Sequence, residues 1–140
     1  MMSMAFVILA VLASECSSSK ESNGIVFAKV RVNMTNDMSQ HTLTIHCKSD
    51  DDDLGEHALS YGQSFHWHFK IDYFLRTLFT CDMWWNDSSG KLVKGNYDIY
   101  QATRDWKRCR RYCSFPIRVD GVYGFMRETQ TFVLVYPWPK

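Results

Sequence analysis

Short runs in which apolar and polar residues alternate constrain the fold of this chain more than any other feature. In one such run Leu43, Ile45 and Cys47 fall on one side, with Thr44 and His46 on the other. A period of two is the signature of a β-strand with one buried face, so Cys47 is predicted to point into the core. No run combines a 3.6-residue apolar period with capping residues, and the sequence therefore predicts strands rather than helices.

Eight stretches of this kind follow one another, separated by residues that favour turns. This spacing predicts an all-β fold, an antiparallel β-sandwich or barrel. With 140 residues, of which 46% are hydrophobic, 15% aromatic and 22% charged, the chain has the composition of one folded domain. We expect that domain over residues 25–140, after a flexible lead-in at residues 17–24. The predicted strands cover residues 25–34, 42–48, 65–71, 77–85, 92–100, 109–119, 122–126 and 131–136.

The apolar start of the chain predicts export. Residues 4–13 are apolar and are followed by small and polar residues, which is the layout of a secretory signal and its cleavage region. We expect a signal peptide over residues 1–16, cut after Cys16 or Ala13. A helix of this length spans about 15 Å, half of a bilayer's hydrocarbon core, so no permanent membrane insertion is expected. The alternative is a buried N-terminal strand or helix, because no Lys or Arg precedes Lys20.

An exported chain meets an oxidising space, where the four cysteines of the predicted domain should form two disulfides. Cys47, Cys81, Cys109 and Cys113 allow three pairings. If Cys109 and Cys113 lie on one strand, their Cα atoms are about 13 Å apart, beyond the roughly 7 Å limit for a disulfide. Both would then pair outward, and we favour the nested arrangement, Cys47 with Cys113 and Cys81 with Cys109, over the crossed one.

A zinc site is the competing interpretation of the cysteines. His46 adjoins Cys47, and His66 and His68 share one face of a predicted strand. Structural zinc takes close pairs such as Cys-x-x-Cys, which the sequence lacks, so no metal and no cofactor is expected. His66 and His68 are instead predicted on the solvent side of their strand.

Two tripeptides meet the N-glycosylation rule, Asn33-Met34-Thr35 and Asn86-Asp87-Ser88. Alternation places Asn33 on the polar side of its strand, and Asn86 falls in a predicted turn, so a glycan on either could project outward. We predict both asparagines as glycosylation sites.

Charge is concentrated in two segments, although the net charge is only +1. The first places five carboxylates within seven residues, at 50–53 and Glu56. It lacks the ligand spacing of an EF-hand loop and the separated carboxylates of a glycosidase, which leaves a solvated turn or a partner contact. The second, residues 104–111, holds five cations and one acid. It is too short and isolated for a nucleic-acid surface, so no nucleic acid is expected.

We interpret the second segment as an ordered surface loop tethered by Cys109. Recognition residues usually lie in loops on a rigid sheet. Arg104 and Asp105 could instead form an ion pair that only shapes the turn. The predicted partner-binding residues are Asp50, Asp51, Asp52, Asp53, Arg104, Asp105, Lys107, Arg108, Arg110 and Arg111.

The sequence offers no catalytic set. It contains no Gly-x-Ser-x-Gly motif, and its cysteines are expected to be oxidised. A secreted carbohydrate-binding protein or hydrolase is the alternative function, because Trp67, Trp84, Trp85 and Trp106 could stack on sugars.

Together these motifs resemble the small secreted self-incompatibility proteins of plants, the stigma type that is not a ribonuclease, and their homologues. The resemblance covers nearly all of the predicted domain. Just after the last cysteine, where the family often has Trp, this chain has Ser114 and Phe115. The resemblance rests on Val32-Asn33, residues 43–49 with the acidic 50–55 behind them, residues 62–69, 77–81 and 97–100, Arg104-Asp105, and Cys109 with Cys113.

The resemblance implies a cleaved signal, a disulfide-bonded β-sandwich, frequent glycosylation, and secretion as a protein ligand read by a surface receptor. The family's founding role is the rejection of self pollen, and its homologues serve other signalling tasks. We therefore expect a secreted, non-enzymatic signalling ligand in the extracellular space, acting as a monomer on a receptor protein.

Overall fold

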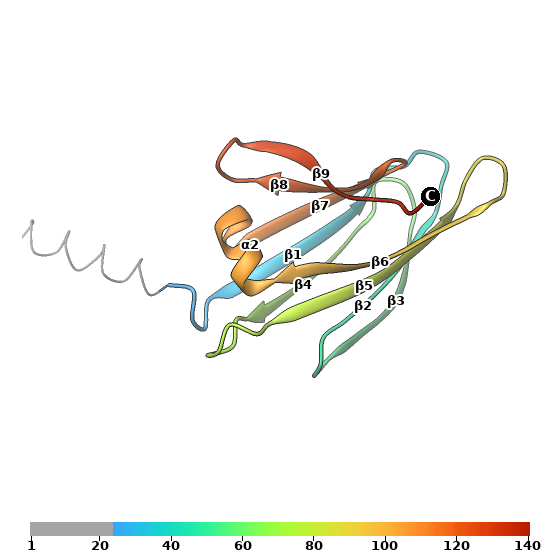
Figure 1. The fold of residues 1–140 in the computed structure, drawn as a ribbon. Helices are drawn as coiled ribbons and strands as arrows, with labels where there is room; N and C mark the ends of the chain where they lie inside the picture. Colours follow the sequence, from blue (N-terminus) through green and yellow to red (C-terminus); the bar gives the residue numbers. More distant parts are fainter. Residues whose placement is uncertain (1–23) are drawn as a thin grey trace, which may run out of the picture.

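The computed structural model describes residues 24–140 (Figure 1). The predicted signal peptide, and the predicted lead-in except for Gly24, lie outside these residues. The described part of the chain forms nine strands and one helix of 8 residues. In chain order they are β1 (Lys29–Asn36), β2 (Leu43–Lys48), β3 (Asp53–Leu59), β4 (Ser64–Lys70), β5 (Leu78–Asn86), β6 (Leu92–Gln101), α2 (Ala102–Cys109), β7 (Tyr112–Arg118), β8 (Gly121–Met126) and β9 (Thr131–Pro137).

The strands form the two sheets of a sandwich, as the sequence predicts. One sheet has five strands in the order β4-β1-β7-β8-β9, and the other has four in the order β3-β2-β5-β6. Neighbouring strands are antiparallel except β1 and β7, which run parallel. The parallel pair arises because the chain enters β7 from the other sheet, through α2, and not through a hairpin. The predicted antiparallel sandwich is therefore correct except for this one pair.

The core lies between the sheets and is built from the alternating apolar positions of both. Met34 of β1 is fully buried, and its Sδ lies 3.9 Å from Cys47 Sγ and 4.0 Å from Cys81 Sγ on the opposite sheet. Phe69 of β4 packs against Phe79 of β5, with ring centroids 4.8 Å apart. These contacts confirm that Cys47 and Cys81 point into the core.

The disulfide pairing differs from the nested arrangement that we favoured. Cys47 bonds Cys81, and Cys109 bonds Cys113. Cys47 and Cys81 lie directly opposite each other on the paired strands β2 and β5. Cys109 is not on a strand, because it ends α2, and the chain turns back at Arg110, whose φ is 55°. This turn brings the Cα atoms of Cys109 and Cys113 to 5.1 Å, instead of about 13 Å along a strand.

Three predicted boundaries are also wrong. β3 occupies part of the segment interpreted as an acidic loop, so the described residues form nine strands rather than about eight. α2 replaces the start of the strand predicted at residues 109–119 and the loop before it. The strand predicted at residues 25–34 begins and ends later, since β1 covers Lys29–Asn36.

The hairpin of β8 and β9 diverges from the rest of its sheet. β7 and β8 pair at only two positions, Ile117 with Val122 and Arg118 with Gly121. The hairpin is tight there, since a Cβ on Gly121 would clash with the backbone oxygen of Tyr136. Farther along, β8 stays paired with β9 but separates from β7. The hairpin therefore forms an arm that diverges from β7 toward α2 (Figure 1), and we call the angle between β7 and this hairpin arm the wedge.

Candidate functional site

Four connections lie together at one end of the sandwich, which we call the α2 end (Figure 1). They are residues 49–52 between β2 and β3, 71–77 between β4 and β5, α2 with its following turn at 110–111, and 127–130 between β8 and β9. Consecutive strands reverse direction, so every second connection returns to this end. Both charged segments noted in the sequence therefore lie on the same end of the molecule, and their charges are opposite.

The acidic turn at residues 50–53 is exposed. Asp53 opens β3, where its Oδ1 accepts the Gly55 N–H at 2.9 Å and lies 2.6 Å from His46 Nε2. The Gly55 N–H, and then the His46 contact, hold the pKa of Asp53 below its ordinary value. The remaining carboxylates border a pocket of about 370 Å³ facing the β4–β5 connection, and they belong to Asp50, Asp51 and Asp52.

The helix α2 is organised around the buried side chain of Asp105. Its carboxylate accepts the Gln101 N–H at 2.7 Å and forms ion pairs with Arg104 at 2.8 Å and Arg108 at 3.0 Å. A charge removed from water is unfavourable unless it is paired and hydrogen-bonded, which accounts for the convergence of both arginines. The Arg108 guanidinium also lies 5.1 Å from the ring centroid of Phe115.

This arrangement corrects the prediction that Asp105 and Arg108 contact a partner. Asp105 is 0% exposed, and the side chain of Arg108 is 11% exposed. A Cβ on Gly124 of the hairpin arm would lie 3.1 Å from Arg108 Nη1, so this arginine is closely packed inside the wedge. Both residues hold α2 against the sandwich. The Arg104–Asp105 ion pair that the sequence left open is present, and its carboxylate is buried.

Three other cations of this segment face solvent. Lys107, Arg110 and Arg111 are exposed and form no ion pair with any residue from 24 to 140. The guanidinium groups of Arg110 and Arg111 lie 5.4 Å and 5.8 Å from the ring centroid of Trp106. Both contacts fall in the range of cation–π attraction, so Trp106 orders the two arginines without neutralising them.

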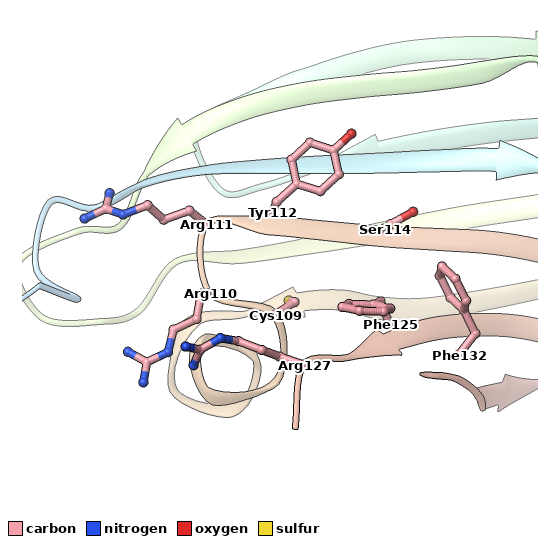
Figure 2. A pocket seen from close by; sticks show the side chains of 8 residues that line it. All are labelled: Cys109, Arg110, Arg111, Tyr112, Ser114, Phe125, Arg127 and Phe132. Atoms are coloured by element: carbon pink, nitrogen blue, oxygen red, sulfur yellow. The ribbon is translucent and has the colours of Figure 1, made fainter. Parts of the chain in front are cut away.

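A pocket of about 530 Å³ opens beside these cations, on the wedge between β7 and the hairpin arm (Figure 2). Its apolar walls come from Tyr112 of β7 and from Phe125 and Phe132, whose rings pack edge to face with centroids 5.2 Å apart. Arg127, in the β8–β9 turn, adds an exposed cation. We call this the wedge pocket, lined by Cys109, Arg110, Arg111, Tyr112, Ser114, Phe125, Arg127 and Phe132.

The contribution of the hairpin arm was missed at the level of sequence. Phe132, Val133 and Leu134 are consecutive, and they are 45%, 39% and 42% exposed. In a strand with one buried face, apolar and polar residues alternate. Three consecutive apolar residues break this alternation, and they could have indicated from the sequence that both faces of β9 are accessible at the edge of its sheet. Arg127 precedes them in the same hairpin and shared no motif with the basic run on α2.

The two predicted glycosylation sites lie away from the α2 end. Asn33 is on the outer face of β1, where its Nδ2 donates to Thr35 Oγ1 at 3.3 Å. Asn86 is exposed at the end of β5, at the opposite end of the sandwich (Figure 1). Glycosylation of Asn33 and Asn86 stays a prediction.

Within residues 24–140, no group of three or more His, Cys, Asp or Glu side chains is placed to hold a metal ion. In the same residues, no helix is long and apolar enough to cross a membrane. His66 and His68 lie exposed on the outer side of β4, as predicted from the alternation.

Comparison with known proteins settles the family. The family model described as "Plant self-incompatibility protein S1" matches residues 31–138. This chain belongs to the plant self-incompatibility protein S1 family. "S-protein homolog 24" of Arabidopsis thaliana is 35% identical over 138 residues, covering 98% of this chain and 88% of the relative. "Self-incompatibility protein S1" of Papaver rhoeas is 34% identical over 119 residues, covering 84% of this chain and 82% of the relative.

A solved structure supports the fold of this family member. It is described as "Structure of SPH (Self-Incompatibility Protein Homologue) proteins, a widespread family of small, highly stable, secreted proteins from plants". It matches with a TM-score of 0.58 and 18% sequence identity, over 80% of this chain and 96% of that chain. The resemblance inferred from the sequence is thus confirmed, together with the sandwich and membership of a family of secreted plant proteins.

Proposed function

We propose that this member of the plant self-incompatibility protein S1 family is a monomeric, non-enzymatic signalling ligand, and that a receptor protein at a cell surface recognises its α2 end. The observation that carries the proposal is the convergence of two exposed, oppositely charged segments on one end of a rigid sandwich. These are the acidic turn at residues 50–53 and the exposed cations of α2 and its following turn, Lys107, Arg110 and Arg111.

Rigidity supports recognition by this end. One disulfide fixes β2 to β5, next to the acidic turn, and the other fixes the end of α2 to β7. Binding loses free energy whenever mobile loops become ordered, so loops that are already held in place lose less. A surface with both signs of charge also fixes the orientation of the partner, because rotating it would bring like charges together.

A binding role is favoured over catalysis or carbohydrate binding. The four cysteines of the described domain are paired in disulfides, so they supply no thiol nucleophile. Trp67 and Trp85, two of the tryptophans considered for sugar stacking, are buried at 7% and 5% exposure. Both rings pack in the core and cannot stack on a ligand.

The direct test uses the secreted protein, fluorescently labelled, on plant protoplasts. A surface receptor predicts saturable binding that is lost when the cells are treated with protease beforehand. The triple variant Lys107→Gln, Arg110→Gln and Arg111→Gln should weaken binding at least about tenfold, because charge-assisted contacts at the α2 end are removed.

The matched control neutralises two exposed lysines of β6 and its turn at the opposite end, Lys91→Gln with Lys94→Gln, and should bind within about twofold of the wild type. Binding that cannot be saturated, or that survives protease treatment, would contradict recognition by a receptor protein. Turnover of RNA or wall polysaccharide by the purified protein would contradict the non-enzymatic assignment.

A further inference from the structure

The wedge pocket combines aromatic rings, an open shape and cations that form no ion pair with residues 24–140 (Figure 2). We propose that it binds an acidic peptide segment of a partner protein, with an aromatic side chain of the segment between the pocket's rings and its flanking carboxylates on the arginines. This inference rests on the proposed function, and it names the chemistry by which the partner is recognised.

The shape of the wedge pocket follows from the divergence of the hairpin arm. β7 and β8 pair only near Ile117 and Val122, so toward α2 the two strands leave a gap. Arg108 fills the inner part of this gap and packs on Phe115. The outer part stays open, and there Tyr112 and Phe132 are 54% and 45% exposed. An open site of about 530 Å³ with aromatic walls is large enough to receive one aromatic side chain together with its neighbours.

The charges around the rings select an anionic partner. Arg110, Arg111 and Arg127 all line the wedge pocket, and none forms an ion pair with residues 24–140. Arg104 and Arg108 of α2 differ from these three, because both are paired with the buried carboxylate of Asp105. Three uncompensated guanidinium groups beside a low-dielectric wall attract carboxylates, which they can bind through two parallel hydrogen bonds.

The cations are held in place before any partner arrives. Arg110 and Arg111 lie over Trp106, and the Cys109–Cys113 disulfide closes the turn that carries them. The carbonyl of Arg111 also accepts the Arg31 N–H at 2.8 Å, which ties the turn to β1. Fewer side-chain rotamers are therefore lost on binding than for arginines on a mobile loop.

A peptide fits this site better than a nucleic acid or an anionic polysaccharide. The chain has a net charge of only +1, and the three arginines lie together at one edge of a compact pocket (Figure 2) instead of forming a track that follows a long polyanion. The walls are two phenylalanines and a tyrosine, which suit a single side chain inserted between two strands.

Fluorescence anisotropy with the full secreted protein tests the proposal. The probe is the labelled peptide Gly-Glu-Glu-Phe-Glu-Glu-Gly, and the comparison peptides replace every Glu by Lys or the Phe by Ser. We expect saturable binding of the first peptide only. The affinity should fall steeply as NaCl is raised from about 0.05 M to about 0.5 M, because the contacts are partly exposed ion pairs.

Two variants separate the charge from the apolar wall. Arg110→Gln with Arg127→Gln should weaken peptide binding at least about tenfold, and Phe132→Ser should weaken it without changing its salt dependence. The control Lys91→Gln with Lys94→Gln removes the same charge from the opposite end and should stay within about twofold.

Failure of the Glu and Phe peptide to bind, equal binding of the Lys peptide, or tighter binding of oligogalacturonate than of the peptide would each overturn the proposal. These outcomes are separable from the proposed function. If protease-sensitive binding to protoplasts survives Arg110→Gln with Arg127→Gln but is lost in the triple α2 variant, the wedge pocket is wrong and receptor recognition stands.

Discussion

Both sides of α2 and its following turn carry cations, but those on the inner side hold the helix on the sandwich and those on the outer side face solvent. On the inner side, Arg104 and Arg108 converge on the buried Asp105 and anchor the helix to the sandwich. On the outer side, Lys107, Arg110 and Arg111 are exposed and have no ion pair among the described residues. A basic run in a sequence therefore mixes cations that support the fold with cations available to a partner, and here the ion pairs with Asp105 distinguish them.

The largest loss of stability is expected from replacing Asp105, at the centre of the inner side. Asp105→Ala leaves Arg108 buried without its counterion and removes the acceptor of the Gln101 N–H. Loss of one partner of a buried ion pair costs about 3 to 5 kcal/mol in the free energy of unfolding. Urea denaturation measures it, with Glu128→Gln as an exposed acidic control nearby. A change below about 1 kcal/mol would show that Asp105 does not hold the helix.

A smaller loss of stability is expected from opening the disulfide that closes the turn after α2. Replacing Cys109 and Cys113 together by Ala opens a ring with a sequence separation of 4, which costs about 2 kcal/mol on the chain-entropy model. The same replacement of Cys47 and Cys81 should cost more, because that ring has a separation of 34. Thermal unfolding of both double variants measures the difference, and the reverse order would contradict this account.

Tyr136 of the hairpin arm contacts the strand that leads into α2, next to the inner side of the helix. Its hydroxyl donates to the Asp98 carbonyl at 2.7 Å, so Tyr136→Phe should cost about 1 kcal/mol at neutral pH. Burial raises the pKa of Tyr136, and the folded state therefore keeps a proton that the unfolded state loses above about pH 10. Stability should fall as pH rises through this window, and the Phe variant should lose less of it.

Urea titrations of the wild type and Tyr136→Phe at neutral and alkaline pH would show this difference. The exposed Tyr61→Phe is the control and should follow the wild type. An equal alkaline loss in Tyr136→Phe and the wild type would mean that the phenol of Tyr136 does not contribute.

The smallest effect on stability is expected on the outer side. Lys107→Gln with Arg111→Gln removes exposed charges that form no ion pair with residues 24–140, so the free energy of unfolding should change by less than about 0.5 kcal/mol. The same urea titration measures it, beside Asp105→Ala. A loss of more than about 1 kcal/mol in the free energy of unfolding would show that the outer cations also stabilise the fold, and would contradict the distinction between the two sides.

The sequence predicts the strands well wherever one face is buried. Alternation located β1, β2 and β5, because each has one face buried against the opposite sheet. It missed β3, in which only Leu59 is buried, since an edge strand rich in acidic residues shows no alternation. It also missed α2, whose buried positions are Ala102, Asp105 and Cys109. Their spacing is helical, but a charged residue stands where the apolar pattern needs a hydrophobic one.

The candidate site could be predicted only in part. The acidic turn and the exposed cations of α2 are visible as charge runs, and the structure brings them to one end. The wedge pocket is not visible, because it depends on where β8 leaves β7, a tertiary feature set by two residue pairs. The disulfides depended likewise on a helix that the pattern did not reveal.

The connections alternate between the two ends of the sandwich, and the C-terminus lies at the end opposite α2 (Figure 1). A fluorescent protein or purification tag joined after Lys140 would therefore sit far from the acidic turn and the arginines. Surface attachment through such a tag would display the α2 end outward, ready for capture of binding partners.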